Sequence, residues 1–237
     1  MIVLNSITLN QATFDAAIID LDGTMVDTMG DFVVAINLML GDMGFSPVDR
    51  SVVELRVGKG SEYLVKSVLN SLLAQSNRSQ VAINTEADVE SALGLYQKHY
   101  RVVNGRHAEA YPGVLEGLQG LQKAGLKLAC LTNKPLAFAQ ALLRLKGLDG
   151  FFSVVFGGDS FERKKPDPLP LIKTCESLGT APARTLMIGD SSNDAQAARA
   201  AGCPVVLVTY GYNHGESVLS VDADAYVDSL ADIVELK

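Results

Sequence analysis

The chain has 237 residues, of which 48% are hydrophobic and 20% charged, as is typical of a globular protein with one large domain or two modest ones. Its formal net charge of −7 and the lack of a basic run argue against nucleic acid or an anionic membrane surface as a partner. No apolar run approaches the roughly 18 residues of a transmembrane helix, so we expect neither partner.

The first predicted element is a strand over residues 16–19, an apolar run without alternation that indicates burial on both faces, as in a parallel sheet. It leads directly into Asp20 and Asp22, and Gly23 then allows a sharp turn. Carboxylates at the carboxyl end of such a strand lie where open α/β sheets bind ligands. An Asp-Gly turn alone would be ordinary turn chemistry. Two buried carboxylates, however, require a metal or another cation as a partner, which favours a functional site.

A helical segment follows, and no strand signal occurs between residues 30 and 105. Apolar residues recur at spacings of three and four, the pattern of helices with one buried face. Helices are predicted over residues 31–40, 51–57, 64–73 and 85–100. We therefore expect residues 31–105 to form an all-helical cap domain, inserted just after the first strand.

From residue 111 onward, strands and helices alternate. Strands are predicted over residues 126–131, 152–156, 185–188 and 205–208, and helices over residues 114–124, 135–147, 168–178 and 193–201. Such alternation implies a parallel sheet with helices on both faces. We expect an α/β core of residues 1–30 and 106–237, built on a doubly wound, Rossmann-like parallel sheet.

Polar residues follow two further strands of this core. Thr132 and Asn133 follow the second predicted strand, and Asp190 and Asp194 follow the fourth. Lys165 lies between them in the chain, just before the helix predicted over residues 168–178. The carboxyl ends of parallel strands share one edge of the sheet, so these side chains and those after the first strand converge. Taken singly, Thr132-Asn133 also fits a turn and Lys165 an exposed loop, but their combination favours one site.

The converging groups predict a magnesium-dependent site for a phosphoryl group. So many carboxylates repel one another unless a cation joins them. Oxygen ligands without His or Cys indicate Mg²⁺, with Asp20 and Asp190 as the carboxylate ligands. Thr132, Asn133 and Lys165 are donors of the kind that a phosphoryl group requires.

In this order, the stretches resemble the four motifs of the haloacid dehalogenase superfamily of aspartate-nucleophile phosphatases. The matching residues are Asp20-Leu21-Asp22-Gly23-Thr24, Leu131-Thr132-Asn133, Lys165-Pro166, and Gly189-Asp190 with Asp194. Within that superfamily the chain is most similar to bacterial phosphoglycolate phosphatases. The supporting stretches lie at residues 111–114, 131–135, 156–159, 189–191 and 209–212.

The resemblance implies hydrolysis in two steps. Asp20 attacks phosphorus and forms an aspartyl-phosphate. Asp22 protonates the leaving oxygen and later deprotonates the water that hydrolyses the intermediate. By the same resemblance, the backbone carbonyl of Asp22 joins Asp20 and Asp190 in holding Mg²⁺, while Lys165 and Thr132 hold the phosphoryl oxygens.

The resemblance also implies roles for Asp194 and for the cap. Asp194 orients Lys165 or a metal-bound water, and the cap closes over the site and reads the part of the substrate beyond the phosphate. If the substrate is 2-phosphoglycolate, the cap must recognise a carboxylate. Arg56 and Lys59 flank Gly58 in the most loop-like stretch between the cap helices, so we predict that they bind it. An equally simple interpretation is a solvated charged loop.

Other functions remain open on the sequence alone. They include a phosphatase for another small phosphate ester, such as a sugar phosphate or a nucleotide, and a phosphomutase on the same scaffold. Signalling receiver domains also combine Asp, Thr and Lys with Mg²⁺, but they are much shorter and have no role for the second aspartate. We expect a small phosphorylated metabolite as the partner, and a monomer or a weak homodimer.

The cysteines and the N-terminal residues bear on the compartment. Cys130, Cys175 and Cys203 are far apart and form no Cys-x-x-Cys motif, which argues against a zinc site. We expect them to be small core residues of a protein in a reducing compartment. Residues 1–13 contain neither Lys nor Arg and no long apolar run, unlike a signal peptide. These features predict a cytoplasmic location.

Overall fold

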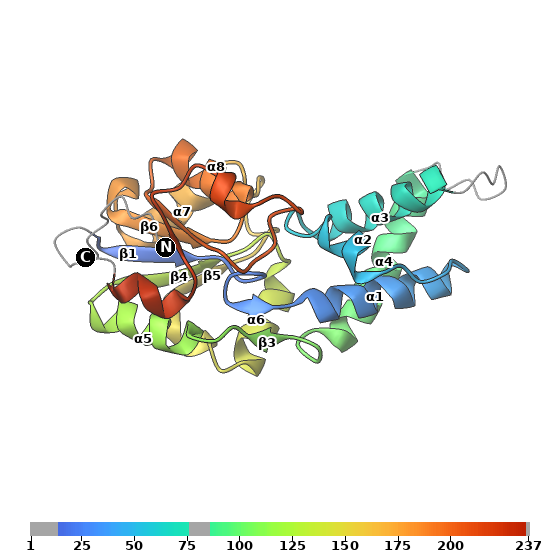
Figure 1. Ribbon diagram of the computed structural model, residues 1–237, viewed down its shortest axis with the longest axis horizontal. Coiled ribbons are helices and arrows are strands. Elements are labelled where there is room, and N and C mark those ends of the chain that lie inside the picture. The colour runs from blue at the N-terminus through green and yellow to red at the C-terminus, as the bar shows by residue number, and fades with distance from the viewer. Residues whose placement is uncertain (1–13, 76–85, 236–237) are drawn as a thin grey trace.

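The protein has two lobes in the computed structural model, which describes residues 14–75 and 86–235 (Figure 1). One lobe is a sheet with helices on both faces, and the other is a group of helices at its end. In the described residues, the large sheet has six parallel strands in the order β5-β4-β1-β6-β7-β8. Their bounds are Ala16–Ile19 (β1), Lys127–Leu131 (β4), Val154–Phe156 (β5), Thr185–Gly189 (β6), Val205–Val208 (β7) and Ala225–Val227 (β8). This arrangement confirms the expected doubly wound parallel sheet.

Strand β1 lies at the centre of the sheet, because all four of its residues are apolar and suited to burial on both faces. It pairs with β4 on one side and with β6 on the other. The chain first extends the sheet from β1 through β4 to β5, and then returns to add β6, β7 and β8 on the opposite side. The carboxyl end of β1 is therefore at the topological switch point, where such sheets bind ligands.

Two pairs of helices cover the two faces of the sheet. Helices α5 (Val114–Lys123) and α6 (Leu136–Leu145) contribute to the hydrophobic cluster on one face. Helices α7 (Leu169–Leu178) and α8 (Ser192–Ala201) contribute to the cluster on the other. Short 3-10 helices lie at Asp149–Phe151, Pro182–Arg184, Val218–Ser220 and Leu230–Glu235. Both faces of the strands are thus buried, which explains their unbroken apolar runs.

The second lobe is formed by four helices that we call the cap: α1 (Met29–Asp42), α2 (Arg50–Glu54), α3 (Ser61–Gln75) and α4 (Glu86–Val103). They enclose their own hydrophobic cluster, to which α1 contributes the predicted stripe of Phe32, Ile36, Met39 and Leu40. The described residues between 30 and 105 contain no strand, in line with the expected all-helical segment. We propose that these helices form the inserted domain expected over residues 31–105.

A small antiparallel sheet that the sequence did not predict connects the two lobes. Strand β2 (Val26–Asp27) enters the cap and pairs with β3 (Glu109–Ala110), which leaves it. Beside this sheet, the fully buried Asp31 of α1 accepts hydrogen bonds from the N–H groups of Gly105 at 2.5 Å and His107 at 2.8 Å. The two connections are therefore tied to each other.

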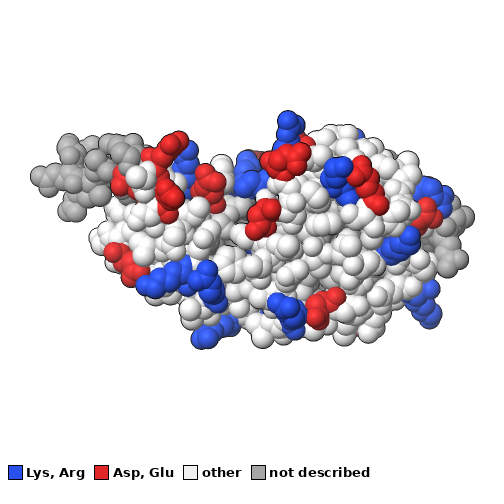
Figure 2. All heavy atoms as spheres, turned by 180° about the vertical axis from the view of Figure 1, so that it is seen from behind, with Lys and Arg blue, Asp and Glu red and all other residues white. Residues whose placement is uncertain are grey.

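The surface and the remaining sequence-based expectations can be compared with the structure where it is described. On the face in Figure 2, acidic and basic residues of the described chain are interspersed over both lobes. No helix among the described residues is long and apolar enough to cross a membrane. Cys130, Cys175 and Cys203 are free and buried, as expected. Residues 1–13, and Thr85 at the expected start of α4, lie outside the described residues.

Candidate active site

Side chains from three strand ends and from the cap enclose one cavity. Asp20 follows β1, Thr132 follows β4 and Asp190 follows β6, and these three strands are neighbours in the sheet. The cavity is small, with a volume of about 40 Å³, which is room for only a few water molecules. Seven of the nine predicted site residues line it, namely Asp20, Asp22, Thr132, Asn133, Lys165, Asp190 and Asp194.

Lys165 joins two of the carboxylates. Its Nζ donates hydrogen bonds to Asp20 Oδ1 at 2.7 Å, to Asp194 Oδ1 at 2.7 Å and to the backbone oxygen of Leu131 at 2.8 Å. All three N–H donors of the ammonium group are thus used. Lys165 is only 3% exposed, and the two carboxylates compensate its buried charge.

Burial and crowding shift the ionisation of the acidic groups. Burial raises the pKa of Asp20 to about 7, against the opposing effect of Lys165 and with a further rise from Asp194. Burial, and then Asp194 and Asp20, raise the pKa of Asp190 well above its ordinary value. Burial lowers the pKa of Lys165, but Asp194 and Asp20 outweigh it and hold the pKa above the ordinary lysine value. One buried lysine therefore does not offset the negative charge of this cluster.

The carboxylates of Asp20, Asp190 and Asp194 form a buried trio, in which one oxygen of each lies within 4.8 Å of the others. An oxygen-only set with excess negative charge is chemically suited to Mg²⁺. Both oxygens of Asp194 already accept hydrogen bonds, one from Lys165 and the other from Ser191. Asp20 and Asp190 each accept a hydrogen bond from the described residues at one carboxylate oxygen only, so they are better placed to hold a cation.

The backbone at Gly23 and at Gly211 lies close to the side chain of Asp190 and fixes the position of its carboxylate. Gly23 has a φ of +86°, and a Cβ atom there would lie 2.0 Å from Asp190 Oδ2. A Cβ atom at Gly211 would lie 2.2 Å from Asp190 Cβ. The next residue, Tyr212, donates its N–H to Asp190 Oδ2 at 2.6 Å. The turn after β1 and the loop after β7 therefore leave room for Asp190 in one position only.

The start of α8 orients Asp194. Ser191, the residue before the helix, donates its N–H and its Oγ–H to Asp194 Oδ2 at 3.2 Å and 2.8 Å. These contacts belong to the capping arrangement in which an acidic residue of the first turn reaches back to the N-cap. They leave Asp194 Oδ1 free to accept the hydrogen bond from Lys165. This contact is compatible with one of the two roles that the resemblance implied for Asp194, the positioning of Lys165, which stays a prediction.

The loop after β4 places Thr132 and Asn133. Thr132 is buried, and its Oγ1 accepts the N–H of Lys134 at 3.2 Å. The Asn133 amide donates to the backbone oxygens of Gly58 at 3.0 Å and of Lys165 at 2.8 Å. The Asn133 side chain therefore connects the cap loop that contains Gly58 to the loop that contains Lys165. Its predicted role in binding the substrate stays a prediction.

Known proteins resemble this chain over most of its length. A family model described as haloacid dehalogenase-like hydrolase matches residues 17–208. The chain belongs to this family. A protein of Thiobacillus denitrificans named phosphoglycolate phosphatase is 43% identical over 218 residues, which are 92% of each chain. One of Nitrosospira multiformis with the same name is 43% identical over 93% of this chain and 94% of its own. A crystal structure described as a predicted phosphoglycolate phosphatase from Haemophilus somnus has a TM-score of 0.89 and 32% identity, covering 95% of this chain and 99% of its own.

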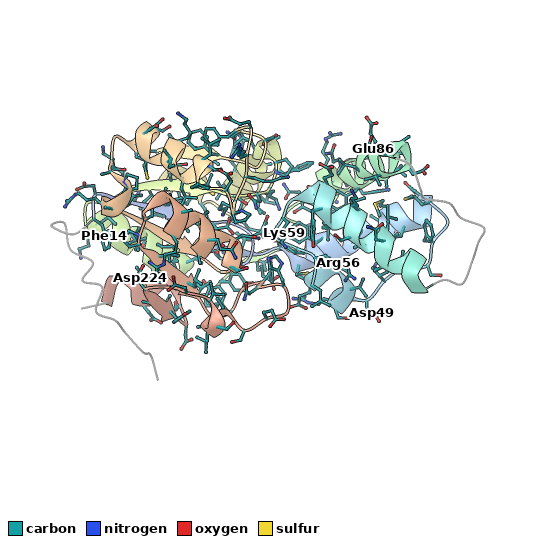
Figure 3. All side chains as sticks on the ribbon, turned by 90° about the horizontal axis from the view of Figure 1, so that it is seen from above. Phe14, Asp49, Arg56, Lys59, Glu86 and Asp224 are labelled. Carbon is teal, nitrogen blue, oxygen red and sulfur yellow. The ribbon has the colours of Figure 1, made fainter. Side chains whose placement is uncertain are left out.

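In this haloacid dehalogenase-like hydrolase, the two predicted cap residues are not among those that line the cavity. Figure 3 shows Arg56 and Lys59 on the part of the cap nearest the sheet. The Arg56 guanidinium donates to the backbone oxygens of Val52 at 2.5 Å and Ser67 at 3.2 Å, within the cap. Lys59 is exposed, and its Nζ lies 5.1 Å from the centroid of the Tyr63 ring. In this conformation, both cations therefore have local roles.

The lining also includes residues that were not assigned a role from the sequence, among them Lys134, Asn193 and Tyr212. Lys134 directly follows Thr132-Asn133, and its adjacency to that motif was the available signal. Asn193 donates to the backbone oxygen of Gly58 at 3.3 Å, as a second contact with the cap loop. Tyr212 reaches the site because the loop after β7 folds back over Asp190, and no local pattern predicts that path.

Proposed function

We propose that this hydrolase acts on a phosphoric monoester, and that its substrate is 2-phosphoglycolate, which it converts to glycolate and phosphate. The observation that carries the proposal is the cavity in which Lys165 joins Asp20 and Asp194 beside Asp190, with Asp22 in the same lining. A carboxylate with such neighbours is suited to accept a phosphoryl group. The names of the relatives that are 43% identical over nearly the whole chain support the substrate.

In the first step, a carboxylate oxygen of Asp20 attacks phosphorus, and the bond between phosphorus and the ester oxygen breaks. Asp22 donates a proton to the departing oxygen, so that glycolate leaves as an alcohol. Lys165 offsets the charge on the phosphoryl oxygens from its fixed position between Asp20 and Asp194, and the Thr132 hydroxyl donates to the same oxygens. The product on the protein is an aspartyl-phosphate at Asp20.

In the second step, Asp22 accepts a proton from water, which attacks the aspartyl-phosphate and releases phosphate. Asp20 then returns to its carboxylate form and Asp22 to its protonated form, so the cycle is complete. The ligands of Mg²⁺ in this proposal are Asp20, Asp190 and the backbone carbonyl of Asp22. When bound, the ion supplies positive charge that offsets the carboxylates and the phosphoryl oxygens.

The decisive experiment is phosphate release from a panel of small phosphate esters, ranked by kcat/KM, with Mg²⁺ and no other activator. We expect 2-phosphoglycolate to rank first, ahead of sugar phosphates and nucleotides. A phosphomutase would instead require a bisphosphate activator and return the phosphoryl group to the sugar. A higher kcat/KM for a sugar phosphate or a nucleotide would replace the proposed substrate but leave the phosphatase assignment in place.

The nucleophile is tested by the variant Asp20→Asn, which keeps the size of the side chain but removes the anion. We expect no measurable phosphate release and a thermal unfolding midpoint at least as high as that of the parent. Asp49→Asn is the matched control, because it removes the same charge from an exposed position on the cap (Figure 3). Full turnover by Asp20→Asn would show that another residue attacks phosphorus.

The remaining parts of the proposal concern the setting of the enzyme. We propose a cytoplasmic monomer or weak homodimer that binds neither nucleic acid nor membranes. The acidic and basic residues interspersed on the face in Figure 2 support the part of this proposal that concerns nucleic acid, because they leave no extended basic patch on that face. Sedimentation velocity over a range of concentrations would measure the oligomeric state directly.

A further inference from the structure

Lys134 is a buried cation between the core and the cap. Its side chain is 2% exposed, and its Nζ donates to Asp22 Oδ1 at 2.8 Å, with Asp22 Oδ2 at 3.1 Å. It also donates to the hydroxyl of Tyr100, on cap helix α4, at 2.6 Å. The rings of Phe32 and Tyr100 each have their centroid 4.8 Å from Nζ. Such a contact with aromatic faces is favourable for a cation withdrawn from water.

The two lysines of the cavity differ in the number of carboxylates that they contact, two for Lys165 and one for Lys134. Among the described residues that line the cavity, Lys134 and Lys165 are the basic ones. Lys165 already uses its three N–H donors on Asp20, Asp194 and the backbone oxygen of Leu131. Lys134 contacts both oxygens of a single carboxylate, that of Asp22, at 2.8 Å and 3.1 Å, and one hydroxyl, so exchange of the longer Asp22 contact frees one donor for a further acceptor. A second anionic group on a ligand would therefore find its cation at Lys134.

The position of Lys134 also matches the shape of the substrate. In the proposed mechanism, Asp22 contacts the ester oxygen of 2-phosphoglycolate. The carboxylate carbon of this substrate is only two bonds beyond that oxygen. Lys134 Nζ is in hydrogen-bond contact with Asp22 on the cap side of the cavity, so a carboxylate at this distance falls within its reach.

We propose that Lys134 determines substrate specificity by binding the carboxylate of the substrate beyond its phosphate, an inference that rests on the proposed function. Phe32 and Tyr100 of the cap lie beside this subsite, each with its ring centroid 4.8 Å from Lys134 Nζ. The Asp22 carboxyl group and the carboxylate of the substrate then both contact the ammonium group. Recognition through Lys134 needs no contact from Arg56 or Lys59.

The test measures binding without turnover, in the Asp20→Asn background with saturating Mg²⁺. Two ligands are compared by calorimetry: 2-phosphoglycolate and 2-hydroxyethyl phosphate, in which a neutral hydroxymethyl group replaces the carboxylate. We expect Lys134→Met to weaken the binding of 2-phosphoglycolate at least about tenfold, the usual consequence of losing a hydrogen bond to a charged group. The binding of 2-hydroxyethyl phosphate should change much less.

Lys66→Met is the matched control, because Lys66 is an exposed lysine on cap helix α3. It should leave the affinity for both ligands unchanged. If Lys134→Met does not fold, Lys134→Gln provides the same comparison, with a donor kept and the charge removed. Equal weakening of both ligands would overturn the inference, and so would a selective loss in Lys59→Met with none at Lys134.

The result is separable from that of the proposed function. If the parent enzyme released no phosphate from 2-phosphoglycolate, the proposed function would fail. A Lys134-dependent preference for the carboxylate ligand would still support the subsite in that case. If the parent hydrolysed 2-phosphoglycolate but the preference survived in Lys134→Met, only the inference about Lys134 would fail.

Discussion

At the scale of single residues, each of the four neighbouring carboxylates of the site has a different set of hydrogen-bond partners. Asp20 is paired with Lys165, Asp22 with Lys134, and Asp190 with the N–H of Tyr212. Asp194 is held by Lys165 and by Ser191. Identical side chains can therefore serve as nucleophile, proton carrier, metal ligand and support, because the environment of each favours a different chemistry.

The role of Asp22 as a general acid can be tested through the leaving group. Asp22→Asn cannot donate a proton, so kcat/KM for 2-phosphoglycolate, with its alkyl leaving group, should fall by roughly 10²–10⁴-fold. For 4-nitrophenyl phosphate the fall should be much smaller, because the aryl oxide leaves without protonation. The comparison uses kcat/KM, which includes formation of the aspartyl-phosphate but not its hydrolysis. Equal losses on both substrates would contradict the role of a general acid.

These residues could be predicted from the sequence to the extent that they follow strands. Asp20, Thr132 and Asp190 were placed together because the strand ends of a parallel sheet share an edge. The contacts of Lys134, Asn133 and Tyr212 depend on how the cap and a distant loop approach the sheet, which no local pattern contains. The prediction for Arg56 and Lys59 used loop composition alone; in this conformation neither lines the cavity, and their role in binding the substrate stays a prediction.

At the scale of elements, the short turn between β1 and β2 determines the geometry of the site. It has to bring its backbone against Asp190, which requires both the positive φ of Gly23 and the absence of a side chain there. The long strands and helices were predictable because their apolar periodicity extends over several residues. Strands β2 and β3 have two residues each and β8 has three, too few for a pattern, and they form because of their neighbours.

Gly23→Ala tests this turn. The added methyl group meets the Asp190 carboxylate at 2.0 Å, so we expect a loss of stability, a loss of activity of at least about tenfold, and a weaker rise of the unfolding midpoint on adding Mg²⁺. Gly44→Ala is a close control, because Gly44 also has a positive φ, of +78°, but no atom within 4 Å of the added carbon. The free energy of unfolding of Gly44→Ala should fall only by the roughly 1–2 kcal/mol that a left-handed backbone conformation costs, and its activity should equal that of the parent. Similar behaviour of the two variants would show that the clash with Asp190 is unimportant.

The connection that leaves the cap depends on Asp31 of helix α1. Asp31→Ala would leave the N–H groups of Gly105 and His107 buried without an acceptor, and we expect a loss of roughly 1–3 kcal/mol for each in the free energy of unfolding. Asp31→Asn keeps the size and one acceptor oxygen, so it should lose less. Urea denaturation of the three proteins measures the difference. An unchanged stability in Asp31→Ala would mean that water replaces the carboxylate.

At the scale of the whole molecule, each lobe has its own hydrophobic cluster, and polar groups connect the lobes over the site. The backbone oxygen of Gly58 in the cap accepts hydrogen bonds from Asn133 and Asn193 of the core, and Lys134 contacts Tyr100. Most hydrophobic packing lies within a lobe, although Tyr212 and Phe138 of the core pack into the cluster of the cap. The hydrogen bonds named above add polar contacts between the lobes at the cavity. Such contacts are exchangeable with water, which suits a cap that must open to admit a substrate.

The charge cluster under the cap should link stability to both pH and Mg²⁺. The ordinary pKa of an aspartate is near 3.9, whereas burial raises that of Asp20 to about 7. Between these values the folded protein holds a proton that the unfolded chain releases, so the contribution of this group to stability falls as the pH rises. A bound cation favours the ionised form of Asp20, so it offsets this loss of stability at higher pH. We therefore expect Mg²⁺ to raise the thermal unfolding midpoint more at about pH 8 than at about pH 5, where protons compete for the same carboxylates. Asp190→Asn should remove most of this difference, and an equal rise at both pH values in the parent would place the Mg²⁺ site elsewhere.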